Sequence, residues 1–180
     1  DKQYYTILIQ KDLDSLVEKI TRADLVSFDL ETTSVTSLEA DIVGLSFSIR
    51  ANEGYYIPIE YPEKKSKPGL SLDPVLEKLK PIFENSNYRF CGQNIKYDLS
   101  VFATHNIDVA PIDDTMLLSY VLNAGKHNHG MDTLSERYLQ HNTIPFKEIA
   151  GTGKSQVTFD RIALDKATEY AAEDADITLR

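Results

Sequence analysis

The sequence predicts one α/β domain built on a mixed β-sheet flanked by α-helices. Strand-like alternation of apolar and polar residues dominates the first third of the sequence, and helical periodicity alternates with short strand-like runs after it. A length of 180 residues fits a single domain, which we expect to span residues 1–180. The final helical pattern still runs at Arg180 without a C-cap signal, which indicates a fragment of a larger chain.

The N-terminal segments predict a strand, a helix and a central strand. Residues 4–9 alternate as a strand does, and the apolar residues of 13–20 have helical spacing. Residues 25–31 are nearly all apolar apart from two acids, which is typical of a strand covered on both faces. Because side chains alternate along a strand, we expect Asp29 and Glu31 to share one face.

A β-hairpin and a helix are expected next. Residues 43–49 and 55–59 alternate on either side of a turn-prone segment, which predicts the hairpin. The polar, basic segment 63–69 predicts a surface loop. Asp73 is expected to be the N-cap of a helix whose first residue is Pro74.

Short strands and helices complete the predicted chain. Pro81 is expected to kink or split the helix that contains it. The later expected elements are a strand over 88–92, a helix around 95–102, helices over 116–122 and 131–139, and a helix from about Leu164 to the end.

The overall charge argues against tight binding to nucleic acid. The formal net charge is −9, whereas phosphate backbones are normally bound by clustered Lys and Arg. Carboxylates that hold cations would change this, because the bound ions attract phosphate. The single cysteine, Cys91, cannot form an internal disulfide, and no apolar run approaches the ~18 residues that span a bilayer. We expect a cytoplasmic monomer that does not contact membranes.

Asp29 and Glu31 are the first candidates for chemistry. They stand two residues apart on a buried strand with no basic residue nearby in sequence. Buried like charges cost several kcal/mol unless they are paired, protonated or bound to a metal, so the pair favours a cation site. The alternative is that this end of the strand reaches solvent, where water hydrates both acids and they need no partner.

Two further segments carry candidate residues. Asp98 lies in the first turns of a predicted helix, where it either serves a site or simply interacts with the helix N-terminus; Asn94 is expected to be that helix's N-cap. Tyr170 and Asp174 are four residues apart on a predicted helix and so share a face, either as part of a site or as a simple hydrogen bond.

The alanines of residues 170–176 allow this last helix to approach the sheet closely. Glu173 and Asp176 point away from the shared face of Tyr170 and Asp174, and are expected to be solvated surface acids.

These segments resemble the three motifs of the DEDD exonuclease superfamily, in its tyrosine subgroup. The motif-like segments are FDLETTS (28–34), GQNIKYD (92–98) and YAAEDAD (170–176), in the right order and spacing. Together with intervening segments such as 114–117 and 131–134, they resemble more narrowly the 3′→5′ proofreading exonuclease domain of family A DNA polymerases, the DNA polymerase I type. The resemblance covers almost the whole chain and implies a ribonuclease H-like fold.

The resemblance also implies a metal-dependent mechanism. Two divalent ions, Mg²⁺ with Mn²⁺ able to substitute, are expected to be held by Asp29, Glu31, Asp98 and Asp174. Asp29 would bridge the ions, Asp98 would act through water, and Tyr170 would position the attacking water. The products would be 5′-mononucleotides and a shortened strand.

The expected partners are a single-stranded or frayed 3′ end of DNA and the polymerase domain of the same full-length chain. The candidate substrate-binding residues are Thr32, Val35, Asn94 and Phe159. Val35 and Phe159 are expected to pack against terminal bases, although Phe159 fits a core position equally well. Two alternatives remain open: a ribonuclease D-like RNA exonuclease with the same four acids, and a catalytically silent domain of a polymerase.

Overall fold

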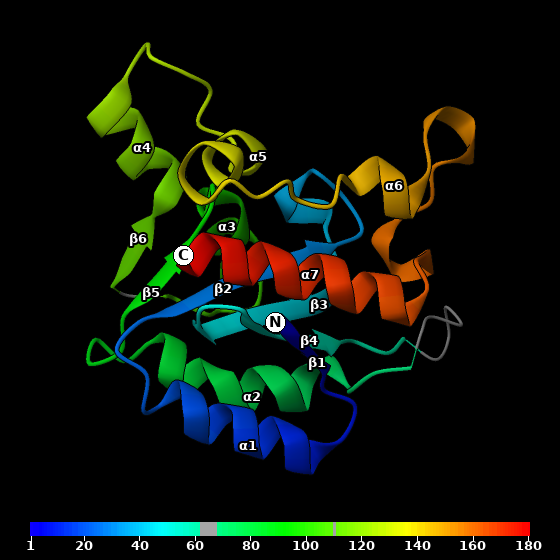
Figure 1. Ribbon diagram of the computed structural model, residues 1–180. Helices are drawn as coiled ribbons and strands as arrows, with labels where there is room; N and C mark the ends of the chain where they lie inside the picture. The colour runs from blue at the N-terminus through cyan, green and yellow to red at the C-terminus, as the bar shows by residue number, and fades with distance from the viewer. Residues whose placement is uncertain (62–67, 110) are drawn as a thin grey trace.

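The computed structural model of the protein describes residues 1–61, 68–109 and 111–180 (Figure 1). Most of the segment 63–69, predicted to be a surface loop, lies outside these residues. The α-helices and β-strands follow in the order β1 (Gln3–Thr6), α1 (Gln10–Ile20), β2 (Val26–Thr32), β3 (Ile42–Arg50), β4 (Glu53–Pro58), α2 (Leu72–Phe83), β5 (Phe90–Gly92), α3 (Lys96–Thr104), β6 (Ile112–Asp114), α4 (Thr115–Asn123), α5 (Met131–Leu134), α6 (Phe146–Ala150) and α7 (Leu164–Leu179).

The described strands form one mixed sheet of six strands in the order β1-β4-β3-β2-β5-β6. The hairpin predicted from alternation is confirmed, because β3 pairs antiparallel with β4 and also with β2. The β1–β4, β2–β5 and β5–β6 pairs are parallel. As expected, β2 is a central strand, and the helices on both faces confirm the α/β class.

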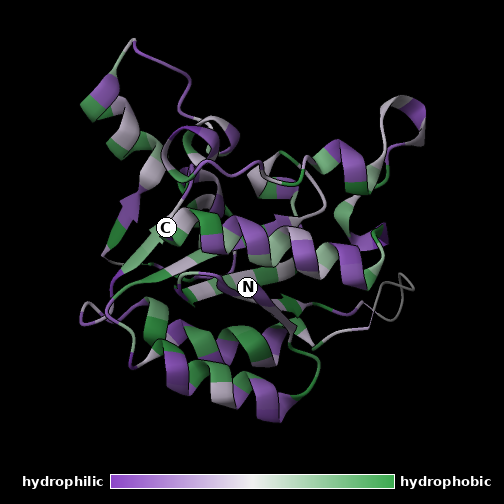
Figure 2. Cartoon of the chain, in the orientation of Figure 1, coloured by the Kyte–Doolittle hydropathy of each residue, from purple (hydrophilic) through white to green (hydrophobic). Residues whose placement is uncertain are grey.

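Helices α1 and α2 cover one face of the sheet and α7 lies across the other (Figure 1). The core on the α1/α2 side centres on Phe28, whose ring centroid is 5.1 Å from that of Phe83 and 5.7 Å from that of Phe102. Hydrophobic and hydrophilic residues alternate along α1 and α2, as expected of helices with one buried face (Figure 2). None of the described helices is long and apolar enough to cross a membrane.

Helix α7 lies directly on the sheet. Ala171, Ala172 and Ala175 are fully buried, as the prediction of a close approach requires. Gly54 in β4 makes the same contact possible from the strand, because a Cβ atom at this position would lie 2.5 Å from the carbonyl oxygen of Ala172. Small residues on both sides therefore bring the side chains of α7 within reach of β2.

One local prediction about α2 is wrong, and a second is wrong in part. Its N-cap is Ser71, so Asp73 lies in the first turn instead of capping the helix. The helix also continues past Pro81 to Phe83 without splitting. Pro81 is close to the C-terminal end, where it removes only one bond of the helical ladder.

The predicted helix over 131–139 is present as two consecutive segments, one α-helical and one π-helical. Helix α5 passes into a π-helical turn, Ser135–Leu139, which ends at Gln140 with a left-handed φ of 53°. This reversal turns the chain toward α7.

Candidate active site

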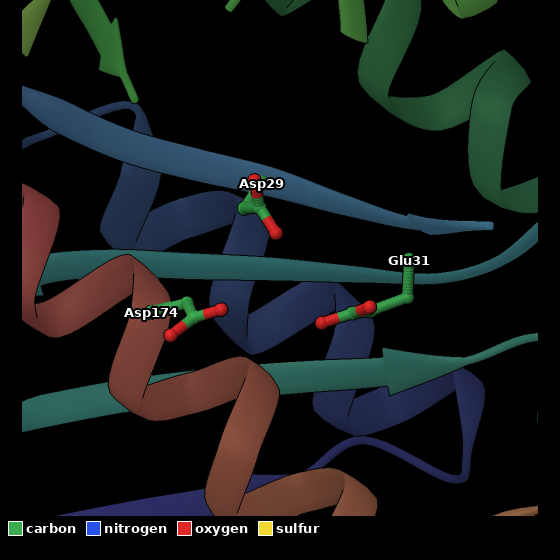
Figure 3. A group of neighbouring side chains, drawn as sticks. All are labelled: Asp29, Glu31 and Asp174. Atoms are coloured by element: carbon green, nitrogen blue, oxygen red, sulfur yellow. The ribbon is translucent and has the colours of Figure 1, made fainter. Parts of the chain in front are cut away.

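Three carboxylates from two remote segments meet between the sheet and α7. Asp29 and Glu31 extend from β2 and Asp174 from α7, each with an oxygen within 4.8 Å of the others. Figure 3 shows the three side chains directed into one space between strand and helix. The predicted shared face of Asp29 and Glu31 is therefore confirmed.

Ser27 fixes the position of α7 relative to this pair. It is fully buried on β2, and its hydroxyl donates a hydrogen bond to the carbonyl oxygen of Ala175. Ser27 is two residues before Asp29, and Ala175 directly follows Asp174. The hydrogen bond thus ties strand and helix together next to both groups of acids.

Asp98 reaches the same strand from α3. It is 3% exposed, and its Oδ1 accepts the backbone N–H of Leu30 at 3.0 Å. Burial raises the pKa of Asp98 most, and the charge of Asp29 raises it further. The two carboxylates are therefore close enough to repel each other. Among the described residues, Asp98 is nevertheless outside the group of three acids within 4.8 Å.

The acids destabilise one another's charged forms. Burial raises the pKa of Asp29 to about 7. Burial, followed by the charge of Asp29, raises the pKa of Asp98 and of Asp174 well above the ordinary value. For Asp174 a hydrogen bond from Tyr170 opposes these effects. Without a bound cation, the site therefore binds protons more tightly than isolated carboxylates do.

The donor set fits a hard divalent cation. Asp29, Glu31 and Asp174 offer only carboxylate oxygens. Mg²⁺ and Mn²⁺ prefer these hard ligands to the thiolate and imidazole groups that softer metals bind. The neighbours that raise the pKa of Asp174, besides its burial, are themselves acids: Asp29, Glu173 and Asp132. A cation at this position would relieve the repulsion that these charges create.

Tyr170 stands beside Asp174 on α7. Its hydroxyl donates a hydrogen bond to Asp174, and burial followed by the charge of Asp174 raises the pKa of Tyr170 far above the ordinary range. Its ring lies against two others, with centroids 5.9 Å from Phe146 and 6.0 Å from Phe159. The aromatic contacts hold the hydroxyl at the edge of the carboxylate group.

A cavity of about 640 Å³ opens beside Glu31. Its lining includes all four predicted substrate-binding residues, Thr32, Val35, Asn94 and Phe159. Val35 is 96% exposed at the rim, whereas Phe159 is 2% exposed and belongs to the core as well as to the wall.

Tyr97 and Phe146 also line this cavity, and the sequence did not single out either. The hydroxyl of Tyr97 lies 2.6 Å from that of Thr32 and donates to the carbonyl oxygen of Ser34. Tyr97 directly precedes Asp98, but neither periodicity nor spacing distinguishes it from a surface tyrosine.

Comparison with known proteins assigns the chain to a family. The family model for the 3′–5′ exonuclease of A-type DNA polymerases matches residues 4–180. The chain belongs to this family. It is 42% identical over 180 residues to DNA polymerase I of Pseudomonas aeruginosa, covering 98% of this chain and 20% of that protein. DNA polymerase I of Rhizobium leguminosarum is 40% identical over 194 residues, covering 98% and 19%. The exonuclease chain thus spans about a fifth of the length of these relatives.

Solved structures share the fold of this exonuclease chain. Escherichia coli RNase D matches with a TM-score of 0.73 at 19% identity, covering 98% of this chain and 42% of that one. Brucella melitensis NrnC with bound Mg²⁺ matches with a TM-score of 0.69 at 16% identity, covering 100% and 78%. At such identities the likeness shows the fold alone, and it confirms the expected ribonuclease H-like form.

The expectation that Glu173 and Asp176 of α7 are solvated surface acids is wrong. Glu173 and Asp176 are 1% and 0% exposed, not solvated. Asp176 accepts hydrogen bonds from the Tyr4 hydroxyl at 2.9 Å and from the backbone N–H of Asn52 at 2.7 Å. Segments remote in sequence cover the side of α7 that helical periodicity alone assigns to solvent.

Asn94 also differs from its predicted role. The N-cap of α3 is Ile95, and Asn94 has a left-handed φ of 57° one residue before it. The backbone N–H groups of Asn94 and Ile95 both donate to the carboxylate of Asp114, each at 3.1 Å. The Asp114 side chain thus binds two backbone donors that precede α3, and the side chain of the N-cap residue makes no capping hydrogen bond.

Proposed function

We propose that the chain removes nucleotides from single-stranded or frayed 3′ ends of DNA, releasing 5′-mononucleotides, and that it serves as the proofreading module of a longer polymerase polypeptide. Its membership of the 3′–5′ exonuclease family supports the direction of degradation. The observation that carries the proposal is the convergence of Asp29, Glu31 and Asp174 within 4.8 Å, beside a cavity of about 640 Å³.

The four acids would hold two divalent cations. Asp29, Glu31 and Asp174 would share one, and Asp29 with Asp98, acting through water, would hold the other. Bound there, such ions would stabilise the negative charge that develops on the attacking and leaving oxygens at phosphorus. Because the carboxylates must be deprotonated to bind, ion binding and proton release are coupled.

The protein side chains orient the reactants. Tyr170 would orient the attacking water through its hydroxyl, whose position Asp174 and the Phe146 and Phe159 rings determine. Apolar and aromatic groups in the cavity wall would stack on the terminal base, which every base permits through its π-face. Recognition would therefore depend little on base sequence.

The acidic charge of the chain supports delivery of the DNA end by another module. A net charge of −9 gives weak attraction for DNA outside the metal site, so delivery of the 3′ end would fall to a polymerase module. Relatives about five times as long, named DNA polymerase I, support such a module in the same polypeptide. Because DNA is the proposed substrate and these relatives are bacterial, we infer that the protein acts in the cytoplasm of a bacterial cell.

The similarity to RNase D supports a second candidate, an RNA exonuclease with the same acids. The deciding experiment incubates the chain and Mg²⁺ with single-stranded DNA and RNA of matched sequence, labelled at the 5′ end. We expect a ladder of shortening DNA and slower loss of RNA. Equal or faster loss of RNA would assign the activity to RNA, and the absence of cleavage in both would identify a catalytically silent domain.

A further inference from the structure

Glu173 is a buried acid outside the carboxylate group just described. It is 1% exposed and directly precedes Asp174. Successive helical residues point about 100° apart, so Glu173 faces other segments than Asp174 does. A buried carboxylate of this kind is strongly unfavourable unless hydrogen-bond donors compensate its charge.

Three donors from two remote segments compensate Glu173. Its Oε1 accepts from Lys2 Nζ at 2.6 Å and from His141 Nε2 at 2.8 Å. Its Oε2 accepts the backbone N–H of Ile144 at 2.6 Å. Burial opposes ionisation, but these hydrogen bonds outweigh it and lower the pKa of Glu173. The loop 141–144 is therefore attached to α7 at both of its ends by one side chain.

This loop leads directly into the wall of the cavity. Ile144 is followed by Pro145 and then by Phe146 at the start of α6. The Phe146 ring packs edge-on against the Tyr170 ring, with a centroid distance of 5.9 Å and an interplanar angle of 66°. A continuous path of contacts thus runs from Glu173 through Ile144 and Phe146 to Tyr170, one helical turn away on the same helix.

We propose that Glu173 is a positioning residue of the nuclease: it clamps the loop 141–144 to α7 and so holds Phe146 against Tyr170. The inference rests on the proposed function, since Tyr170 matters here only if it orients the attacking water. Glu173 belongs neither to the lining of the substrate cavity nor to the three clustered acids. Apart from its charge, which contributes to the raised pKa of Asp174, its effect on turnover is therefore indirect and acts through the Tyr170 hydroxyl.

The sequence offers a clean reporter for this loop. It contains no tryptophan, so a Phe146→Trp substitution introduces a single indole at the contact with Tyr170. In this background, Glu173→Gln removes the negative charge and places an amide among three donors. Acrylamide quenching of the fluorescence of the introduced indole then measures release of the loop without any need for activity.

A matched pair at the other end of the clamp tests the same idea. His141→Leu removes one donor to Glu173, whereas His141→Gln retains an N–H group in a similar place. Lys2→Met removes the ammonium partner without touching the loop and serves as the control for lost charge pairing. The measurements, on chains with native Phe146, are kcat and KM on single-stranded DNA and the Mn²⁺ concentration for half-maximal activity.

For Glu173→Gln we expect kcat to fall about 10- to 100-fold, because a misplacement of about 1 Å of an orienting group has effects of that size. Quenching of the reporter increases. The His141 variants keep the charge of Glu173, so their Mn²⁺ requirement stays unchanged. His141→Leu shifts both readouts in the same direction, His141→Gln restores them, and Lys2→Met has little effect on kcat.

A purely stabilising role would lower the melting temperature but leave kcat of the folded protein unchanged. A kcat within about twofold of the wild type for folded Glu173→Gln would overturn the proposal. If that variant does not fold, the same criterion applies to His141→Leu. An inactive wild-type chain would instead refute the proposed nuclease function.

Discussion

The carboxylate of Asp98 accepts the backbone N–H of Leu30, the residue that separates Asp29 from Glu31, at 3.0 Å. Helix α3 is thereby attached to β2 at the point where both strand acids emerge. Asp98 thus has a structural contact in addition to its proposed share in holding a cation, and substitutions can separate the two roles.

Asp98→Asn and Asp98→Ala should both reduce DNA cleavage by at least about 100-fold, because neither side chain offers a carboxylate to a cation. They should differ in stability. Asn keeps an acceptor for Leu30, whereas Ala leaves the amide unpaired at a cost of about 1–3 kcal/mol. Nuclease assays with urea unfolding check both statements, and undiminished turnover in either variant would contradict the site.

Asp174→Asn should stabilise the metal-free chain by about 1–2 kcal/mol near pH 8, since it removes one charge from a group of repelling acids. The amide oxygen can still accept the hydrogen bond of Tyr170. Thermal unfolding in EDTA measures the effect, with Asp165→Asn in the first turn of α7 as the control. A lower melting temperature for Asp174→Asn alone would argue against the clustering.

Stability of the metal-free chain should fall as pH rises. The pKa of Asp29 is raised from 3.8 to about 7, and those of Asp98 and Asp174 are raised as well. A raised pKa means that the folded state binds protons more tightly than the unfolded state, so the stabilisation is complete below the unfolded pKa and is lost as pH rises through the folded one.

Melting temperatures in EDTA at about pH 5 and pH 8 test this sign. Saturating Mg²⁺ should raise the melting temperature far more at the higher pH, because the ligands bind only when deprotonated. An Mg²⁺ effect of equal size at both pH values would show that these carboxyl groups are not the ligands.

Tyr170→Phe should lower kcat about 10- to 100-fold while the half-saturating Mn²⁺ concentration stays the same. The ring contacts with Phe146 and Phe159 do not involve the hydroxyl and remain, so the melting temperature should fall only by the loss of the hydrogen bond to Asp174. Full activity of this variant on single-stranded DNA would remove Tyr170 from the mechanism and leave orientation of the water to the acids.

Local patterns were sufficient to predict much of the site. Alternation along β2 correctly placed Asp29 and Glu31 on one face, and the alanine-rich pattern of α7 correctly indicated close contact with the sheet. Proximity of segments remote in sequence could not be read from such patterns. The burial of Glu173 and Asp176 depends on the N-terminal strand, the β3–β4 turn and the loop after residue 140, which no helical period reveals.

The placement of Asp98 illustrates the same limit. Sequence reasoning assigned it to the first turns of a helix, as observed, but its distance from the other acids depends on how α3 packs against β2. The expected role of Asn94 was also wrong, because its backbone has a left-handed φ, its N–H group donates to Asp114 of β6, and the helix begins one residue later than expected. Tertiary contacts replaced a local solution in both segments.

The contacts between α7 and the segment around β1 also bear on when activity can arise during synthesis. Lys2 is translated 171 residues before its partner Glu173, and Tyr4 is translated 172 residues before Asp176. Pairings so distant along the chain form slowly and only after both partners are available. We therefore expect the proposed degradation of DNA to begin only after α7 has emerged, and ribosome-stalled chains ending before Leu164 should lack nuclease activity.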